Sequence, residues 1–393
     1  MRKRAPPVSD LCTPTFADLA QRLGFSCDTA GGVVEFRNPF GLENWTLPVL
    51  EITVIVGAVL ALAYAITRWR RHNDPTNLVL WFGAIAYLLI IEPPLYFPAA
   101  FGIAEHVDTM FAHNVFTVDF LWGRLPLYII AIYPMMATVS YEIVRILGVF
   151  RRRGVFIGAL CVGFVHHAFY EIFDHLGPQL RWWEWTLDHP MSQPFFDSVP
   201  LSSVVVFAAL WPMSLAFCVQ LFVGRHVQDG ATYTGWQIVG RTIVVGILAS
   251  IGTAVLPLPA TVGATVSGST TVGGFLYAAE LIVLAAVAIP VLIGQWSRLR
   301  KDRDPATIRH ANPLILRYAA AYLVVMAVLW VTALPAYFGA VDGVTANGDP
   351  IGSLIYAVVC FVIAGLSIAA AATAHPAELN ERVDGAAPQT PVG

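Results

Sequence analysis

Residues 155–175 of the chain read VFIGALCVGFVHHAFYEIFDH. The first half of this run is apolar, and the whole run is long enough to cross a bilayer as a helix, since a span needs about 20 residues. Five ionisable side chains nevertheless lie in its second half: His166, His167, Glu171, Asp174 and His175. Because ionisable side chains are costly in hydrocarbon, we predict a membrane-spanning helix that carries a polar site.

The composition of the whole chain indicates a membrane protein. Of the 393 residues, 57% are hydrophobic and only 12% are charged, whereas soluble domains carry about 25% charged residues. The net charge of −3 argues against a nucleic-acid partner. No long polar stretch follows residue 46. We therefore expect one all-α bundle of transmembrane helices, with the lipid bilayer as its surroundings.

Apolar runs of spanning length predict the individual helices. There are nine of them, near residues 46–67, 77–97, 126–148, 155–175, 199–223, 237–257, 272–296, 313–334 and 352–374. The expected organisation is an extracytoplasmic N-terminal segment (1–45), a transmembrane domain (46–375) and a cytoplasmic tail (376–393). The tail is polar and contains Pro and Gly, so we expect it to be disordered.

The distribution of basic residues predicts the orientation in the cell membrane. Arg clusters follow the first, third and seventh helices, at 68–71, 151–153 and 298–309, whereas the loops at 258–271 and 335–351 contain no basic residue. Because short cytoplasmic loops are enriched in Lys and Arg, the N-terminus is expected outside and the C-terminus inside. Cys12 and Cys27 then lie outside, where they form either a disulfide or two free thiols.

The helix at 155–175 is the centre of the predicted site. His167, Glu171, Asp174 and His175 share one face by the helical period, and His166 lies with Tyr170 on a neighbouring stripe. Such residues can relay protons, exchange protons with a substrate or bind a transition metal. The candidate catalytic residues are His167, Glu171, Asp174, Glu92 and Glu280. The candidate ligands of a divalent metal are His166, His167, Glu171, His175 and His113. The sequence does not show whether a metal or a haem is bound.

Other helices supply polar residues near this site. Glu92 is followed by two prolines, which are expected to break its helix. Glu142 has Arg145 three residues on as a partner, whereas Glu280 needs a partner on another helix or a water-filled cavity.

The loop between the second and third helices contains two further histidines. Residues 103–115 have the pattern of an amphipathic interfacial helix, on which His106 and His113 would share a face. These histidines are then either solvated or additional ligands of a metal site.

Part of the sequence resembles a known family. Asp174, Trp183-Glu184-Trp185, Phe195-Phe196 and Val199-Pro200-Leu201-Ser202-Ser203 are similar to the signature of the membrane carotenoid hydratases, with a longer spacing between Trp185 and Pro200. This resemblance implies an enzyme acting on a polyprenoid. The Ala- and Val-rich helices and the preference for Arg over Lys also resemble uncharacterised multi-pass membrane proteins of high-GC actinobacteria.

Three functions fit these observations. The first is a lipid- or polyprenoid-modifying lyase or hydratase, with Glu171 or Asp174 as the acid and His167 as either the base or a residue that orients the substrate. The second is a proton-coupled transporter in which the same residues form a relay. The third is a structural membrane subunit whose polar residues join helices. The sequence leaves the substrate and the oligomeric state open.

Overall fold

The computed structural model describes residues 12–27, 32–104, 107–301 and 314–373. Within these ranges, nine helical segments are long and apolar enough to cross a membrane. They are α3 (Thr46–His72), α4 (Thr76–Tyr96), α5 (Leu127–Ile146), α6 (Val149–Asp174), the segment Ser203–Gln228, the segment Gly235–Ser267, α11 (Thr270–Lys301), α12 (Leu314–Phe338) and α13 (Leu354–Thr373). The prediction of an all-α bundle with nine spans is therefore confirmed, and the predicted 376–393 tail lies outside the described residues.

Three of these segments are interrupted. α6 has a kink at Gly154, whose backbone angles (φ 83°, ψ 174°) are not helical. The segment Ser203–Gln228 consists of the π-helix η4 (Ser203–Leu210), α7 (Trp211–Val219), a second π-helix η5 (Gln220–Gly224) and α8 (Arg225–Gln228). The segment Gly235–Ser267 consists of α9 (Gly235–Val255) and α10 (Leu258–Ser267). Pro212 and Pro257 lie near the junctions, where proline removes a backbone donor.

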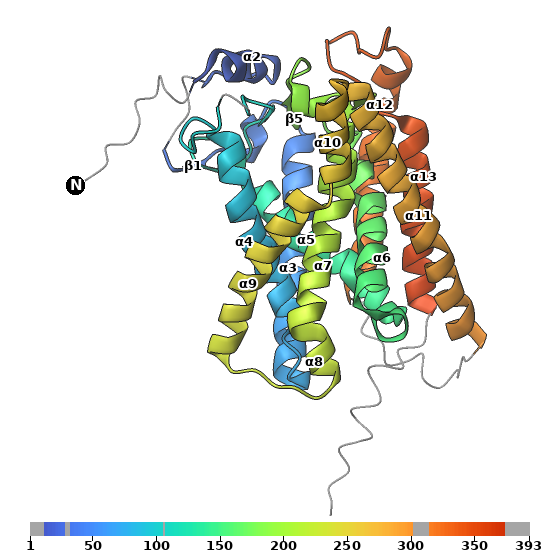
Figure 1. Ribbon diagram of the computed structural model, residues 1–393. Helices are drawn as coiled ribbons and strands as arrows, with labels where there is room; N and C mark the ends of the chain where they lie inside the picture. The colour runs from blue at the N-terminus through green and yellow to red at the C-terminus, as the bar shows by residue number, and fades with distance from the viewer. Residues whose placement is uncertain (1–11, 28–31, 105–106, 302–313, 374–393) are drawn as a thin grey trace, which may run out of the picture.

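The helices pack around α5 and α6, which lie at the centre of the bundle (Figure 1). In the most apolar window of α5, 89% of the residues are buried, against 11% in α11. The low burial of α11 fits a helix that faces lipid on most sides. The polar residues of α6 therefore lie in the interior and not on the lipid-facing surface.

A folded cap covers the end of the bundle where α3 begins and α4 ends (Figure 1). It contains α2 (Pro14–Arg22), η2 (Pro39–Gly41), η3 (Pro190–Ser192) and three small sheets. The sheets have the orders β1-β3-β4, β2-β5 and β6-β7, and all the pairs are antiparallel. Their strands are β1 (Val34–Phe36), β2 (Phe111–His113), β3 (Val118–Phe120), β4 (Leu125–Pro126), β5 (Trp183–Trp185), β6 (Phe195–Phe196) and β7 (Val199–Pro200).

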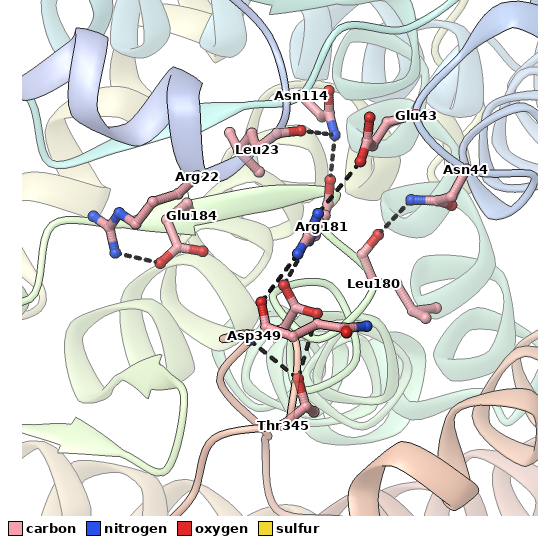
Figure 2. Close-up of polar contacts among 11 residues, drawn as sticks. Arg22, Leu23, Glu43, Asn44, Asn114, Leu180, Arg181, Glu184, Thr345 and Asp349 are labelled. Atoms are coloured by element: carbon pink, nitrogen blue, oxygen red, sulfur yellow. Dashed lines mark hydrogen bonds and ion pairs between the residues drawn. The ribbon is translucent and has the colours of Figure 1, made fainter.

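Ion pairs hold distant segments of the cap together (Figure 2). The Arg181 guanidinium donates to Asp349 at 2.5 Å and lies 3.3 Å from Glu43, so it joins three loops. Arg22 of α2 pairs with Glu184 of β5 at 2.6 Å. A disulfide joins Cys12 and Cys27 at the two ends of the α2 region, as one of the two sequence-based alternatives predicted.

Two local predictions are wrong. Residues 107–115 form no helix: His113 and Phe111 lie in β2, opposite Trp183 and Trp185 of β5, because their aromatic side chains pair across the strands. His106 lies outside the described residues. The two prolines after Glu92 do not break α4 either, which continues to Tyr96. They lie in its last turn, where proline removes only the final hydrogen bonds of the helix.

Candidate functional site

A small cavity lies beneath the cap, between α4, α5, α6 and η4. The centre of a water-sized molecule can move within about 50 Å³ of it, so the space open to the atoms of a ligand is larger than this volume. Aromatic side chains form most of its wall: Phe111, Tyr128, Tyr133, Tyr170, Phe173, Trp183, Trp185, Phe207 and Trp211. Five other polar side chains also line it, namely Glu92, His113, His166, Asp174 and Ser203.

His166 presents a hydrogen-bond acceptor in the wall of this cavity. Its Nδ1 lies 2.7 Å from the carbonyl oxygen of Ala208. A carbonyl oxygen only accepts, so Nδ1 carries the hydrogen, and Nε2 of the neutral ring is an acceptor. This Nε2 atom is buried, and no described residue hydrogen-bonds it. The imidazole can therefore accept a proton from a molecule in the cavity.

Two carboxyl groups line the same cavity from different helices. The Ser203 hydroxyl, at the start of η4, donates to Asp174 at 2.8 Å. The Tyr133 hydroxyl of α5 donates to one oxygen of Glu92, and the other oxygen has no hydrogen-bond partner among the described residues. Because buried polar atoms normally have partners, an unpartnered carboxyl oxygen beside a cavity indicates a place for a ligand or water.

The π-helix η4 positions both histidines of α6. Its carbonyls at Val204 and Ala208 accept hydrogen bonds from the Nδ1 atoms of His167 and His166. The same segment contributes Ser203 and Phe207 to the cavity. π-helical turns are rare and are frequently found at functional sites, which agrees with the position of this one.

His113 completes the cavity wall below the cap. Its Nδ1 lies 2.9 Å from the Tyr128 hydroxyl. Burial lowers the pKa of His113 to about 3, so its ring is neutral at physiological pH and can exchange hydrogen bonds without carrying charge.

The remaining candidates on α6 lie on its other face. His167 accepts from the Tyr356 hydroxyl of α13 at 2.6 Å through Nε2. Glu171 is fully buried, 3.2 Å from His175 Nε2, and the Ser353 backbone N–H donates to His175 Nδ1. These residues connect α6 to η4 and to α13 and its preceding loop. Asp174 thus lies at the cavity with His166 and Tyr170. The helical period had predicted that it would share a face with His167 instead.

The predicted metal ligands are divided between these two faces. His166 and His113 line the cavity, whereas His167, Glu171 and His175 lie on the other side of α6. No group of three His, Cys, Asp or Glu side chains within the described ranges is arranged to hold a metal ion. Glu280, on α11, does not line the cavity, and its carboxyl oxygens have no hydrogen-bond partner in the described part of the chain.

A second polar cluster lies at the opposite end of the bundle. Glu142 accepts from Arg145 at 2.6 Å, from Tyr64 at 2.7 Å and from Asn77 at 2.8 Å. The predicted pairing of Glu142 with Arg145 is confirmed. This carboxylate is fully partnered by donors, as expected of a structural ion pair buried between helices.

The fold and the cavity define a multi-pass membrane protein with nine candidate spans, a folded cap and an acidic, aromatic-walled cavity below it. The chain belongs to the family described as a domain of unknown function (DUF7802), whose model matches residues 37–352. That match includes every residue that lines the cavity. No curated protein and no solved structure matches the chain significantly. The similarity to carotenoid hydratases and to actinobacterial proteins therefore stays a prediction.

Proposed function

We propose that this protein is a membrane enzyme that performs acid–base chemistry on a lipid or polyprenoid, as a hydratase or lyase. The observation that carries the proposal is that Asp174, Glu92 and His166, whose Nε2 has no hydrogen-bond partner among the described residues, line one aromatic cavity. A proton donor and a proton acceptor within one apolar enclosure are what addition or elimination of water requires.

In the hydration direction, the carboxyl group of Asp174 or Glu92 gives its proton to one carbon of a double bond. The π electrons form the new C–H bond, and the other carbon becomes positively charged. A water molecule forms a C–O bond to that carbon and loses a proton to Nε2 of His166. Transfer of this proton from the imidazolium to the carboxylate restores both groups, so the net change is the addition of one water. The lyase reaction is the reverse.

Glu171 and His167, which the sequence suggested for the acid and the base, take a different part in this proposal. Neither lines the cavity. His167 and the Glu171–His175 pair fix α6 against η4 and α13. They are positioning residues, because they hold the helix that carries His166 and Asp174.

The spacing of the polar clusters supports an enzyme over a transporter. Tyr133 at the cavity and Glu142 at the opposite end are nine residues apart on α5, which is about 14 Å along the helix axis. Three hydroxyl groups lie between them on that helix. Those of Thr138 and Ser140 donate to backbone carbonyls of α5 itself, and that of Tyr141 accepts from the Gln220 amide of η5. A proton relay through the bundle would need side chains that bridge this distance.

The test is the lipid composition of cells that produce the protein in water enriched in oxygen-18. Wild-type protein is expected to generate a labelled lipid or polyprenoid alcohol. Asp174→Asn and His166→Gln are expected to lower its amount by about two orders of magnitude, since each removes one proton-transfer group. Asp342→Asn and His226→Gln make the same chemical changes away from the cavity and serve as controls.

Two results would contradict the proposal. If the folded cavity variants yield the same lipids as wild type, the polar residues serve assembly. If purified protein in liposomes moves a solute in response to a proton gradient and alters no lipid, it is a transporter.

A further inference from the structure

The ionisable groups of the cavity wall favour negative charge. Among the described residues that line it, two are carboxylic acids and none is Arg or Lys. Two arginines of the cap have other partners: Arg124 lies over the Phe16 ring at 3.3 Å, and Arg181 pairs with Asp349. A negatively charged ligand group would therefore meet acids without a counter-charge in the cavity wall.

The aromatic side chains of the cavity wall come from several elements of the fold. Trp211 of α7 packs against Tyr133 of α5, with ring centroids 4.9 Å apart, and Phe173 of α6 packs against Trp183 of β5 at 4.7 Å. Nine of the lining side chains are Phe, Tyr or Trp. The face of an aromatic ring attracts a cation, most strongly where water is excluded. A carboxylate and several ring faces around a small enclosure form the chemistry that recognises substituted ammonium groups.

We propose that the cavity binds a substituted ammonium group of about the size of the choline head. The inference deepens the proposed function by naming the charge and class of the group that the cavity holds. Of the two carboxyl groups, one can stay ionised as the counter-ion while the other carries the transferable proton. Three members of the wall are partly exposed, Phe111, Tyr170 and Phe207. The rest of the ligand is expected to leave the cavity past these rings.

The experiment compares two probes that differ in charge but hardly in shape: choline and 3,3-dimethylbutan-1-ol. Binding to the purified full-length protein is measured by calorimetry and by fluorescence of the cavity tryptophans. The protein is held in a maltoside detergent, because detergents with a choline head would compete. We expect choline to bind at least about tenfold more tightly than the uncharged alcohol.

Matched variants locate the binding. Glu92→Gln keeps an acceptor for Tyr133 but removes the charge, and is expected to weaken choline binding at least about fivefold without changing the binding of the alcohol. Trp185→Phe retains a ring of lower affinity for cations and is expected to give a smaller loss. Glu43→Gln removes a carboxylate from the cap, outside the cavity, and is expected to leave both probes unaffected.

Equal affinity for the two probes, or no binding of choline to folded protein, overturns the inference. Displacement of choline by a short-chain phosphatidylcholine would assign the ammonium group to a lipid head, and its failure would assign it to a free organic cation. The binding assay needs no turnover. Choline binding without any change in cellular lipids would thus refute the proposed reaction but support this inference. Lipid conversion without choline binding would support the reaction and refute the inference.

Discussion

Asp74 lies between α3 and α4 and pairs with Arg68, at the end of the bundle opposite the cap. Burial alone would raise the pKa of this carboxyl group, but Arg68 and the Thr76 N–H together lower it to about 2. Because the pKa of Asp74 is lower in the folded protein, ionisation of this carboxyl group stabilises the folded state. This stabilisation is complete above about pH 4 and is lost as the pH falls toward 2. The shift corresponds to about 2 kcal/mol.

We therefore expect Asp74→Asn to lower the free energy of unfolding by about 2 kcal/mol at neutral pH and to flatten the acid limb of the stability profile. Thermal unfolding in detergent between pH 2 and pH 7 measures both effects. Asp229→Asn, an exposed acid near the same surface, is the control and is expected to change little. An unchanged acid limb in Asp74→Asn would show that the ion pair does not contribute.

At the scale of single residues, the sequence predicted several polar residues of the cavity. It did not predict which polar residues of α6 face the cavity and which lie on the other side of the helix. His166 and His167 are adjacent, so they point about 100° apart around α6, and the sequence does not show which direction meets a cavity. Tyr170 was detectable, since it follows His166 by one turn. Ser203 belonged to the stretch that resembles the carotenoid hydratases, but the sequence indicated no role for it. Trp211 could not be predicted as a cavity residue, because its position depends on the π-helix before it.

At the scale of elements, the closest approach of α6 to the segment containing η4 and α7 depends on Gly163. A Cβ atom at this position would lie 2.6 Å from the carbonyl oxygen of Ala209 and 3.0 Å from Cβ of Met213. Gly163→Ala is therefore expected to force the two segments apart and to lower stability by about 1–3 kcal/mol. Because these segments form two walls of the cavity, choline affinity is expected to fall as well.

Gly240→Ala is the matched control for this change. Gly240 lies within α9, and a Cβ atom there would meet nothing within 4 Å. Replacing an open helical glycine by alanine is expected to raise stability by up to about 1 kcal/mol. Thermal unfolding of the two variants side by side separates the steric effect from helix propensity, and a stabilised Gly163→Ala would show that the segments are not in tight contact.

The sequence predicted helices better than the other elements, for a physical reason. An apolar run of spanning length specifies a helix by itself, because a membrane leaves no other way to satisfy the backbone. The strands of the cap contain only two or three residues, and each depends on a distant partner, as β2 depends on β5. The predicted start of the fourth span at 155 agrees with the backbone, because Gly154 has non-helical angles (φ 83°, ψ 174°) and separates residues 149–153 from the rest of α6.

At the scale of the whole molecule, the cap behaves as one unit because side chains of separate loops converge on Arg181. Its guanidinium contacts Asp349, Glu43 and the carbonyl of Asn347. Arg181→Gln is expected to loosen the loop between α12 and α13 at a cost of about 1 kcal/mol, as for other partly exposed ion pairs. Hydrogen exchange of residues 340–352 should then increase, while exchange within α5 stays unchanged. Equal protection of the loop in variant and wild type would contradict this.

The arginines of the two ends of the bundle differ in a way that bears on orientation. In the cap, Arg22, Arg37 and Arg181 form ion pairs with acids, so these three contribute little net charge. At the opposite end, Arg70, Arg71, 151–153, Arg298 and Arg300 are exposed. Exposed basic residues next to spans favour the cytoplasmic side, and the Cys12–Cys27 disulfide of the cap favours an oxidising compartment.

Both arguments favour the predicted orientation, with the cap outside, and labelling of single cysteines tests this prediction. Asp342→Cys lies in the loop between α12 and α13 on the capped side, and Arg152→Cys lies at the start of α6 on the other side. A membrane-impermeant maleimide is expected to label Asp342→Cys in intact cells but Arg152→Cys only after the cells are permeabilised. The native Cys161, Cys218 and Cys360 are buried and provide a low background. The reverse labelling pattern would place the cavity in the cytoplasmic half of the bilayer, and its ligand would then have to be drawn from the inner leaflet or the cytoplasm.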